Sequence, residues 1–478
     1  MVAGTDPEIK ACVHCVSASP VLPASTSSSM SPPELRVIER CQLSPPPGEV
    51  AESTLPLTYL DLIWLQAGSV ERLFFYPFAG VSTSYFVDSI VPSLKASLAV
   101  ALRSFYPLAG KISRSPTRED GFDIHYADGD SVSFTVAEHG GDFHELSGGG
   151  PRLVDKLLPL LPELPRDGGD GLRLLALQAT VFPERGVAIG VSVHHAACDG
   201  SSSMRFMAAW AAATACAGAA PVAPPVLERS FISDPDDLYS FFYKGISAGQ
   251  TIDTMLHQTT SPDAVLESFT IEKKHIDKLK ELATGGAAAA ASFHCSTVVV
   301  AYAYAWVCYV KTRRPRNDKD THALLGFVAD CRGRLKPPVP AAYFGNCLSG
   351  CVVESEIGDL TGKDGVATAA RAIGKAIEAF KEGPFKAFTE ELPKRYKALA
   401  AEQPLSVAGS PKFKVYDLDF GWGRPSKVEI TSIAKTGAIA VAESREEEGG
   451  VEIGLVKPQA EMEAFEKEFY GGLKLLFS

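Results

Sequence analysis

Apolar and small or polar residues alternate between Val187 and His195, with valine or isoleucine at every odd position up to 193. A period of two predicts a β-strand, because successive side chains of a strand point to opposite faces. His195 continues the apolar side, and His194 points the other way. The pattern therefore predicts a strand that delivers one imidazole to the edge of a dry interior.

Helical spacing appears in several longer segments. Leu94, Leu98, Leu102 and Phe105 predict an amphipathic helix that stops before Pro107. A mostly apolar helix is expected between layers, beginning near Ser296 with Ser and Thr at cap-like positions. The predicted helices are 151–161, 201–215, 236–245, 276–282, 296–311 and those around 369–380 and 462–469.

Shorter runs bounded by turn residues predict further strands. Segments 122–126 and 132–136 are expected to form a pair joined at Asp128-Gly129, and 438–442 and 451–455 a pair joined at Gly449-Gly450. Further strands are predicted at 266–271, 413–418 and 428–433. Strands and helices mix in both halves without strict alternation, which favours an α/β fold in layers over a barrel.

Two segments differ from the rest of the chain in composition. Residues 1–33 are rich in Ser, Pro, Thr and Ala and predict a disordered extension. The run from Ala217 to Pro225 contains only Ala, Gly, Pro and Val, which is typical of an exposed linker. We therefore predict an N-terminal domain at 34–216, a linker at 217–232 and a C-terminal domain at 233–478.

The 478 residues are 46% hydrophobic and 22% charged, and no apolar run approaches the ~20 residues that cross a bilayer. The net charge of −11 argues against nucleic acid or an anionic membrane as the main partner. Ten cysteines are scattered along a chain without a secretory signal, which favours reduced thiols and a cytoplasmic location. Cys12 and Cys15 have the spacing of half a zinc site, but no second pair follows, so no metal site is predicted. A monomer is expected.

His195 and Asp199 place a possible general base four residues from a carboxylate. Histidine suits proton transfer because its ordinary pKa lies nearest neutral pH, whereas a buried histidine satisfied by backbone is the alternative. A second cluster, Asp419-Phe420-Gly421-Trp422-Gly423, has two glycines that allow a tight path around a large indole. Taken alone, this cluster favours a turn anchored by Trp422 over a direct catalytic role.

The joint pattern is more specific than either part. HHAACDG at 194–200, YFGNC at 343–347 and DFGWG at 419–423, in this order, closely resemble the plant BAHD acyltransferases. The resemblance implies a two-domain, chloramphenicol-acetyltransferase-like α/β fold with a channel between the domains, which acyl-CoA enters from one face and the acceptor from the other. Supporting segments are 55–65, 105–112, 330–338 and 427–433.

The resemblance also implies roles. His195 would take the proton of an acceptor hydroxyl, Asp199 would hold the loop and the histidine orientation, and DFGWG would be mainly structural. No acyl-enzyme is expected, because Cys198 and Ser201–Ser203 lack an adjacent base with its own orienting group. The oxyanion donor is either the Trp422 indole N–H or a backbone N–H.

Segments 71–78, 409–429 and 443–455 look most like the branch that malonylates phenolic and flavonoid glucosides. Malonyl-CoA carries a carboxylate that needs a cation, for which Arg205 is the candidate, with a structural arginine as the alternative. Arg332 or Arg334 could pair with Asp199. The candidates for binding CoA phosphates are Lys412, Arg424 and a helix N-terminus at Ser296 and Thr297.

Two other functions are weighed against transfer of a malonyl group to a small phenolic acceptor. One is transfer of a hydroxycinnamoyl or other acyl group to an alcohol or amine, and the other is a catalytically silent relative that binds CoA or a partner. The intact His195, Asp199 and DFGWG argue against the silent relative. The sequence does not identify the acceptor.

Overall fold

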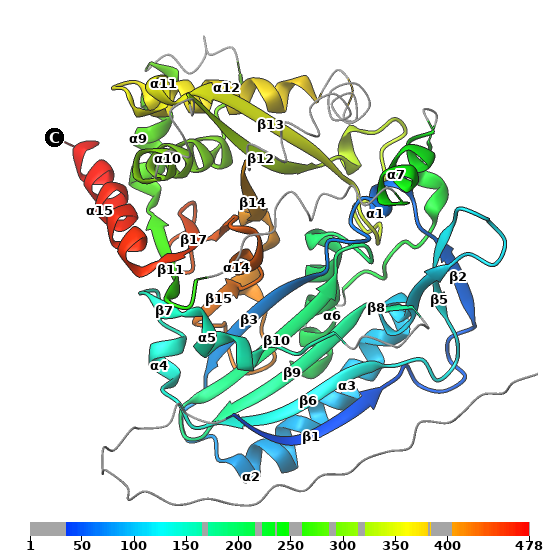
Figure 1. The fold of residues 1–478 in the computed structure, drawn as a ribbon. Helices are drawn as coiled ribbons and strands as arrows, with labels where there is room; N and C mark the ends of the chain where they lie inside the picture. The colour runs from blue at the N-terminus through cyan, green and yellow to red at the C-terminus, as the bar shows by residue number, and fades with distance from the viewer. Residues whose placement is uncertain are drawn as a thin grey trace, which may run out of the picture.

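The computed structural model describes residues 35–164, 171–215, 222–234, 237–247, 261–285, 293–313, 321–380, 383 and 404–477. The predicted extension, the Cys12 and Cys15 pair and the first residues of the predicted linker lie outside this part of the chain. Within it the fold is mixed α/β, with two large sheets that each carry helices (Figure 1).

The first sheet holds the strand that precedes His195. Its order is β1-β6-β9-β10-β3-β15, and all neighbours are antiparallel except the parallel pair β6 and β9. The helices α3 (Val91–Ser104) and α6 (Gly200–Ala215) pack with one core of this sheet. The strands are β1 (Leu35–Leu43), β3 (Ser69–Pro77), β6 (Val132–His139), β9 (Leu175–Phe182), β10 (Gly186–His194) and β15 (Lys427–Ile430).

The second sheet has the order β13-β12-β14-β16-β17-β11-β7. Its core includes α10 (Thr297–Thr312), which is buried along most of its length, together with α9 (Lys273–Thr284), α12 (Gly365–Ala379) and α15 (Gln459–Leu475). The strands are β7 (Arg152–Leu153), β11 (Ala264–Ile271), β12 (His322–Asp330), β13 (Leu348–Glu356), β14 (Leu405–Gly409), β16 (Ile439–Glu443) and β17 (Val451–Pro458).

Smaller elements complete the described chain. A third sheet has the order β2-β5-β4-β8. These elements are β2 (Ser53–Pro56), α1 (Tyr59–Leu62), α2 (Thr83–Tyr85), β4 (Lys111–Arg114), β5 (Phe122–Tyr126), α4 (Phe143–Leu146), α5 (Val154–Leu157), β8 (Leu172–Arg173), α7 (Leu238–Ser247), α11 (Ile357–Thr361) and α14 (Ile433–Thr436).

Each large sheet takes one strand from the other half of the sequence. β15 pairs with β3, and β7 pairs with β11. The described part of the predicted linker also makes contacts, since Val226 bridges to Tyr343 and Arg229 is buried. The division at 217–232 stays a prediction, and the structure adds that the sequence halves interlock.

Most predicted elements are confirmed, including β10, α3, α6, α10, α12, the β16–β17 hairpin and α15. Three predictions are wrong. The strands β5 and β6 exist but belong to different sheets, because the chain turns at Gly129 (φ 91°) from one sheet to the other. The expected helix at 151–161 is reduced to short pieces around Pro159, and the expected strand at 413–418 is two 3-10 turns separated by Lys414 (φ 53°).

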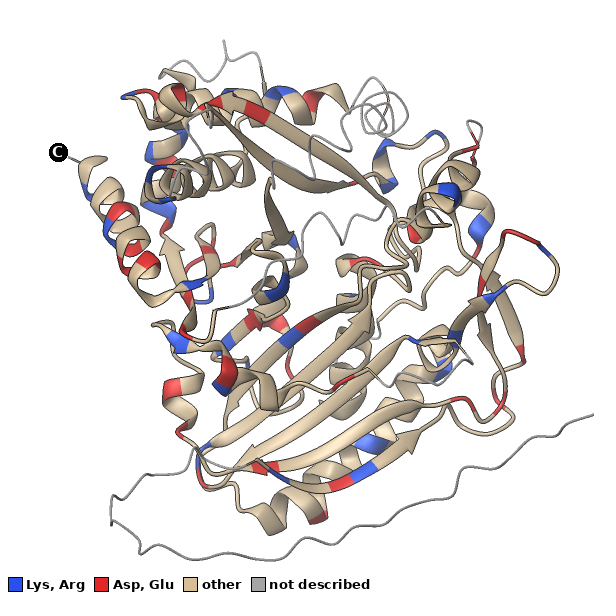
Figure 2. Ribbon diagram, in the orientation of Figure 1, with Lys and Arg blue, Asp and Glu red and all other residues tan. Residues whose placement is uncertain are grey.

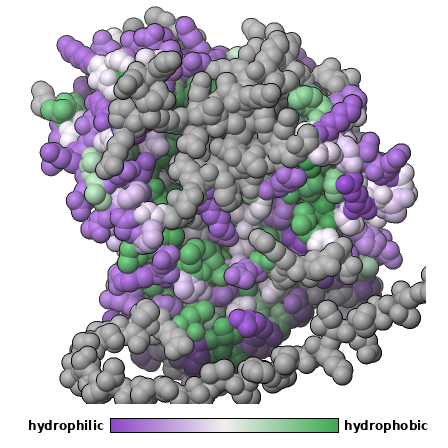
Figure 3. Space-filling model, in the orientation of Figure 1, coloured by the Kyte–Doolittle hydropathy of each residue, from purple (hydrophilic) through white to green (hydrophobic). Residues whose placement is uncertain are grey.

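The distribution of charge follows burial. Figure 2 shows that the central strands of the first sheet are nearly free of charged residues, while both signs are interspersed on outer helices such as α15. On the face drawn in Figure 3, hydrophilic side chains cover much of the described surface, with apolar patches between them.

One helical stretch of the described residues, Thr83–Ser104, has the length and apolar composition of a membrane span. Its buried positions, such as Leu94, Leu98 and Leu102, pack in the core of the first sheet. Length and composition alone are weak evidence for a span, because the core helix of a globular protein passes the same test.

Candidate active site

His195 directly follows β10, and its backbone is fixed on both sides. Its N–H donates to the carbonyl of Gly68 (3.1 Å), and its carbonyl accepts from Asn346 Nδ2 (2.9 Å). The imidazole stacks on Trp64, with ring centroids 3.9 Å apart and an interplanar angle of 13°. The ring therefore has one face covered and a defined position, while the residue is partly exposed.

The surroundings of His195 favour the neutral imidazole. Burial lowers the pKa of His195, and the charge of Arg72 lowers it further. Hydrogen bonding with its own backbone, the charge of Asp199 and the amide of Asn346 act in the opposite direction but do not cancel the shift. A neutral histidine at neutral pH has a free lone pair and can accept a proton.

His194 occupies the opposite side of β10, as the alternation predicts, but this side is also buried. Only 6% of His194 is exposed, its Nδ1 accepts from the N–H of Ala196 (3.2 Å), and burial lowers its pKa to about 4. Two residues earlier, Ser192 Oγ donates to the carbonyl of Pro162 (2.6 Å), so the chain around 160 covers this face. His194 is thus enclosed by protein.

The carboxylate of Asp199 is fully buried and turned to the second half of the chain. It pairs with Arg332 Nη1 (2.8 Å) and accepts from the backbone N–H groups of Ser202 (3.0 Å) and Cys347 (3.1 Å). Arg334 instead donates to the backbone carbonyl of Asp330. Of the two arginines considered from the sequence, Arg332 is the partner of Asp199.

The loop 343–347 connects these groups. Asn346 donates to Asp61 Oδ1 through its backbone N–H (2.9 Å) and its side chain (3.0 Å), and the same side chain holds the His195 carbonyl. At Gly345 φ is 145°, and a Cβ there would lie 2.1 Å from Arg229 Nη1, so a larger residue would displace the arginine. The loop thereby fixes both His195 and Asp199 from across the molecule.

Sequence reasoning assigned no role to Trp64, Asp61, Asn346 or Arg229. The first three lie in the segments 55–65 and 343–347, which were recognised only as part of the resemblance. Their burial and separation of up to 285 positions leave no local pattern that would reveal the contacts.

The DFGWG segment forms a tight turn. Asp419 Oδ1 accepts from the N–H groups of Gly421 (2.7 Å) and Gly423 (2.8 Å), whose φ angles are 91° and 90°. The rings of Phe420 and Trp422 stack with centroids 5.5 Å apart. The aspartate therefore organises the turn, and the aromatic rings anchor it.

Of the two candidates for the oxyanion donor, Trp422 lies away from His195. Its ring packs against Tyr76 (5.5 Å) and Phe78 (6.4 Å) near the end of β3, whereas the His195 backbone is bonded to Gly68 just before β3 begins. At ~3.3 Å per residue, these two ends of the strand lie roughly 25 Å apart. An oxyanion donor must lie about 3 Å from the reacting oxygen, so backbone N–H groups are the candidates left.

The candidate acyl-CoA contacts are distributed over several elements. Arg205, on α6, donates to the carbonyl of Ala341 (3.3 Å). Ser296 caps α10 by accepting from the N–H of Val299 (3.4 Å), and Thr297 Oγ1 accepts from Lys280 Nζ (3.0 Å).

Lys412 and Arg424 lie on either side of Asp419. Lys412 is exposed, whereas Arg424 donates to the carbonyl of Tyr416 (2.9 Å) and lies 3.5 Å from Asp417. Among the described residues, no hydrogen bond or ion pair joins these groups to Ser296 or Thr297. They remain separate candidates for phosphate contacts.

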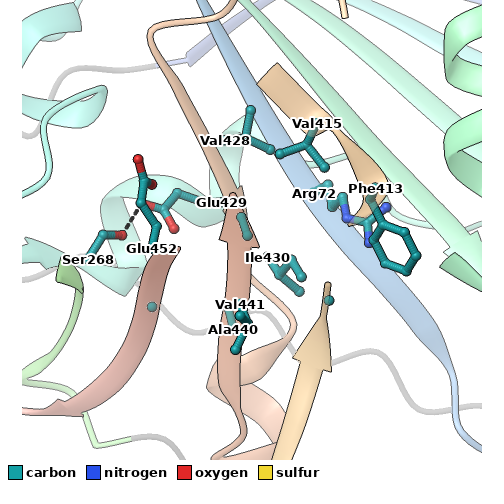
Figure 4. A pocket seen from close by; sticks show the side chains of 13 residues that line it. Arg72, Ser268, Phe413, Val415, Val428, Glu429, Ile430, Ala440, Val441 and Glu452 are labelled. Carbon is teal, nitrogen blue, oxygen red and sulfur yellow. Dashed lines mark hydrogen bonds between the residues drawn. The ribbon is translucent and has the colours of Figure 1, made fainter. Parts of the chain in front are cut away.

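A cavity lies between β15 of the first sheet and β16 and β17 of the second (Figure 4). Arg72 lies beside Phe413 on one side, while Ser268, Glu429 and Glu452 lie on the other. Arg72 is buried, and its Nε has no hydrogen-bond partner. No other candidate cation of the described site combines burial with the lack of an acidic partner.

A model described as the Transferase family matches residues 38–471. Phenolic glucoside malonyltransferase 1 of Arabidopsis thaliana is 35% identical over 465 residues, covering 92% of this chain and 98% of that protein. Coumaroyl-CoA:anthocyanidin 3-O-glucoside-6''-O-coumaroyltransferase 1 of the same plant is 35% identical over 468 residues, covering 93% and 98%.

Two solved structures support the predicted two-domain α/β fold. Vinorine synthase superposes with a TM-score of 0.68 at 21% identity, covering 92% of this chain and 98% of that one. The Fusarium graminearum protein TRI101, crystallised with coenzyme A and deoxynivalenol, gives 0.60 at 18% identity, covering 88% and 98%. At these identities the likeness concerns the fold alone, and the predicted fold is confirmed.

Proposed function

This chain belongs to the BAHD acyl-CoA-dependent acyltransferases, the Transferase family, and from that membership we propose that it transfers a malonyl group from malonyl-CoA to a sugar hydroxyl of a phenolic or flavonoid glucoside. The chain is an acyltransferase that moves groups other than aminoacyl groups, with acyl-CoA as co-substrate. The observation that carries the catalytic part is the fixed, neutral and partly exposed imidazole of His195.

The relatives name two different acyl-CoA donors. Relatives named for malonyl transfer to phenolic glucosides support malonyl-CoA. A coumaroyltransferase at the same 35% identity supports hydroxycinnamoyl-CoA as the second candidate. The buried guanidinium of Arg72, which has no acidic partner among the described residues, favours malonyl-CoA, because this donor carries a carboxylate.

We propose that the imidazole proton of His195 is on Nδ1, which is buried and therefore out of reach of an acceptor. Nε2 then carries the lone pair that accepts the proton of the sugar hydroxyl. The stack on Trp64 limits rotation of the ring and so keeps Nε2 in one direction.

The bond changes follow from this arrangement. As His195 Nε2 takes the proton, the sugar oxygen attacks the thioester carbonyl and a tetrahedral oxyanion forms. The carbonyl is restored when the C–S bond breaks, and the CoA thiolate takes the proton back from the imidazolium. Cys198 is not used as a nucleophile, because burial raises the pKa of its thiol well above the ordinary value.

In this scheme Asp199 holds the catalytic loop in place and does not transfer a proton. Its oxygens are occupied by Arg332 and by backbone N–H groups, which tie the turn after His195 to the loop 343–347. We propose that the enzyme works as a monomer in the cytoplasm. Gel filtration and subcellular fractionation test these two points.

The central experiment is to incubate the protein with a panel of acyl-CoAs and phenolic glucosides, and to follow thiol release and product mass. His195→Ala is expected to lower kcat by about 10³-fold, because general base catalysis contributes ~10²–10⁴-fold. The matched control is His194→Asn, which keeps an acceptor for the Ala196 N–H and is expected to stay within about threefold.

Unchanged turnover in His195→Ala would remove the proposed base. Use of coumaroyl-CoA with no reaction of malonyl-CoA would overturn the malonyl donor and leave the family membership intact.

A further inference from the structure

Arg72 differs from the other buried arginines of the site. Arg229 lies 3.8 Å from Asp61, Arg332 lies 2.8 Å from Asp199, and Arg152 lies 2.6 Å from Glu429. Arg72 is only 7% exposed, yet among the described residues no carboxylate lies within 4.0 Å of its guanidinium, and its Nε has no hydrogen-bond partner. Burial without a partner costs a charged group several kcal/mol.

The guanidinium is nevertheless charged. Burial lowers the pKa of Arg72 to about 10, which still leaves it protonated at neutral pH. Glu443 contributes a favourable charge at longer range, but its Oε1 accepts from the N–H of Tyr416 and it forms no ion pair with Arg72. An anion from outside the chain would complete the site.

Arg72 is directed at the catalytic loop. It stands opposite Val191 on β10, and its Nη2 lies 3.6 Å from where a Cβ of Gly200 would be. Gly200 follows Asp199 and opens α6, a helix whose N-terminal end is capped by Asp199 through the N–H of Ser202 (3.0 Å). The charge of Arg72 also lowers the pKa of His195, so the guanidinium is close enough to the imidazole to affect its charge.

The remaining walls of the cavity favour a small, mostly apolar group over a phosphate chain. The guanidinium lies 5.6 Å from the centroid of the Phe413 ring. Around it the lining is apolar, which suits a short acyl chain with one polar end. The apolar lining comprises Val415, Val428, Ile430, Ala440, Val441 and Ala442.

The acids on the other side do not compete for Arg72. Although burial opposes it, the charges of Lys427 and Arg152 lower the pKa of Glu429 overall. Glu452 lies 2.8 Å from Lys427 and accepts from Tyr416 Oη. These carboxylates have their own cations, so the free guanidinium is the part of the cavity that attracts a negative ligand.

We propose that Arg72 binds the free carboxylate of the malonyl donor and so selects malonyl-CoA over donors with neutral acyl groups. The proposal rests on the proposed function. In malonyl-CoA one CH₂ separates the carboxylate from the thioester carbonyl, so the two carbons are about 2.5 Å apart. A cation that binds this carboxylate must therefore lie beside the catalytic loop, as Arg72 does. Arg205, the candidate from the sequence, donates to the carbonyl of Ala341 and does not line this cavity.

The test compares malonyl-CoA with acetyl-CoA, which lacks only the carboxylate, using one glucoside acceptor. Arg72→Met is expected to lower the ratio of kcat/KM for malonyl-CoA to that for acetyl-CoA by about 10- to 100-fold, the range for a hydrogen bond between charged groups. Arg72→Lys keeps the positive charge but lacks the paired N–H donors of a guanidinium. We therefore expect it to lower the same kcat/KM ratio by an intermediate amount. Arg205→Met is expected to leave the ratio unchanged.

Calorimetric binding of each donor without acceptor should show the same selective loss in Arg72→Met, while the melting temperature stays equal or rises. Parallel losses with both donors would overturn the proposal and make Arg72 a structural residue or a phosphate contact. A selective loss in Arg205→Met alone would transfer the role to Arg205. If the wild type used no malonyl-CoA, the proposed donor itself would fail.

Discussion

At the scale of single residues, the ion pair between Asp199 and Arg332 is the most sensitive point of the site. Both side chains are buried, and their oxygen and nitrogen atoms lie 2.8 Å apart. Removing one partner leaves the other charge in the interior without compensation, which typically costs about 3–5 kcal/mol. We therefore expect this pair to affect stability more than proton transfer.

Asp199→Asn is expected to lower the free energy of unfolding by about 3 kcal/mol, measured by denaturant titration at neutral pH. Arg332→Met should lower it by a similar amount, and the double variant should lose clearly less than both losses added together, because neither charge is then left alone. If Asp199→Asn kept full stability but lost about 10³-fold in kcat, Asp199 would act in the chemistry instead.

The sequence predicted the residues of this pair only in part. HxxxD marks His195 and Asp199 by spacing, but Arg332 and Arg334 stand in the same short segment with the same charge. The 3-10 turn at Arg332–Arg334 decides between them, since it turns Arg332 inward to Asp199 and leaves Arg334 on the surface. Such a choice depends on tertiary packing and leaves no trace in the local pattern.

At the scale of elements, β10 ends at His194 and is followed directly by His195, and burial favours the neutral form of both imidazoles. Burial lowers the pKa of His194 to about 4 and also lowers the pKa of His195. Between these values and the ordinary value near 6.5, the unfolded chain binds more protons than the folded chain. Stability contributed by these residues is therefore present above about pH 6.5 and is lost as the pH falls toward 4.

The free energy of unfolding is expected to fall on acidification, with His194 alone contributing about 2 kcal/mol of loss by pH 5. His194→Asn should remove this contribution and flatten the curve between pH 6.5 and 4.5. Urea titrations of both proteins at several pH values measure the difference. Parallel curves for the two proteins would show that His194 is not buried as a neutral group.

The alternation in β10 was informative because one side carries only valine and isoleucine, but it did not reveal that the other side is covered by residues around Pro162. β3 was not predicted at all. Its residues 71–76 are buried on both faces, so the run shows no alternation to detect. The segment 413–418 had the apolar residues of a strand, but Lys414 at φ 53° breaks the extended path.

At the scale of the whole molecule, the two sequence halves are joined by more than the chain between them. β15 completes the first sheet, β7 extends the second, and the buried pair of Arg152 and Glu429 links an early segment to a late one at 2.6 Å. The resemblance to the BAHD family predicted the correct fold. The residue pattern of 427–433, however, does not indicate that β15 pairs with β3 in the first sheet.

Fragments 35–215 and 222–477 are therefore expected to lack a cooperative unfolding transition when each is produced alone. The first would expose the edge of β3 and leave Asp61 and Asp199 without the loop 343–347, and the second would leave Glu429 without Arg152. Produced together, the fragments should associate through these contacts and regain a single transition.

Circular dichroism during thermal unfolding, with gel filtration of the mixture and the intact chain as reference, tests this prediction. Cooperative unfolding of the isolated first fragment at the temperature of the intact chain would mean that β15 and the loop 343–347 add little to the first sheet. The catalytic loop would then be ordered without its cross-molecule supports, and the position of His195 would depend on β10 and Trp64 alone.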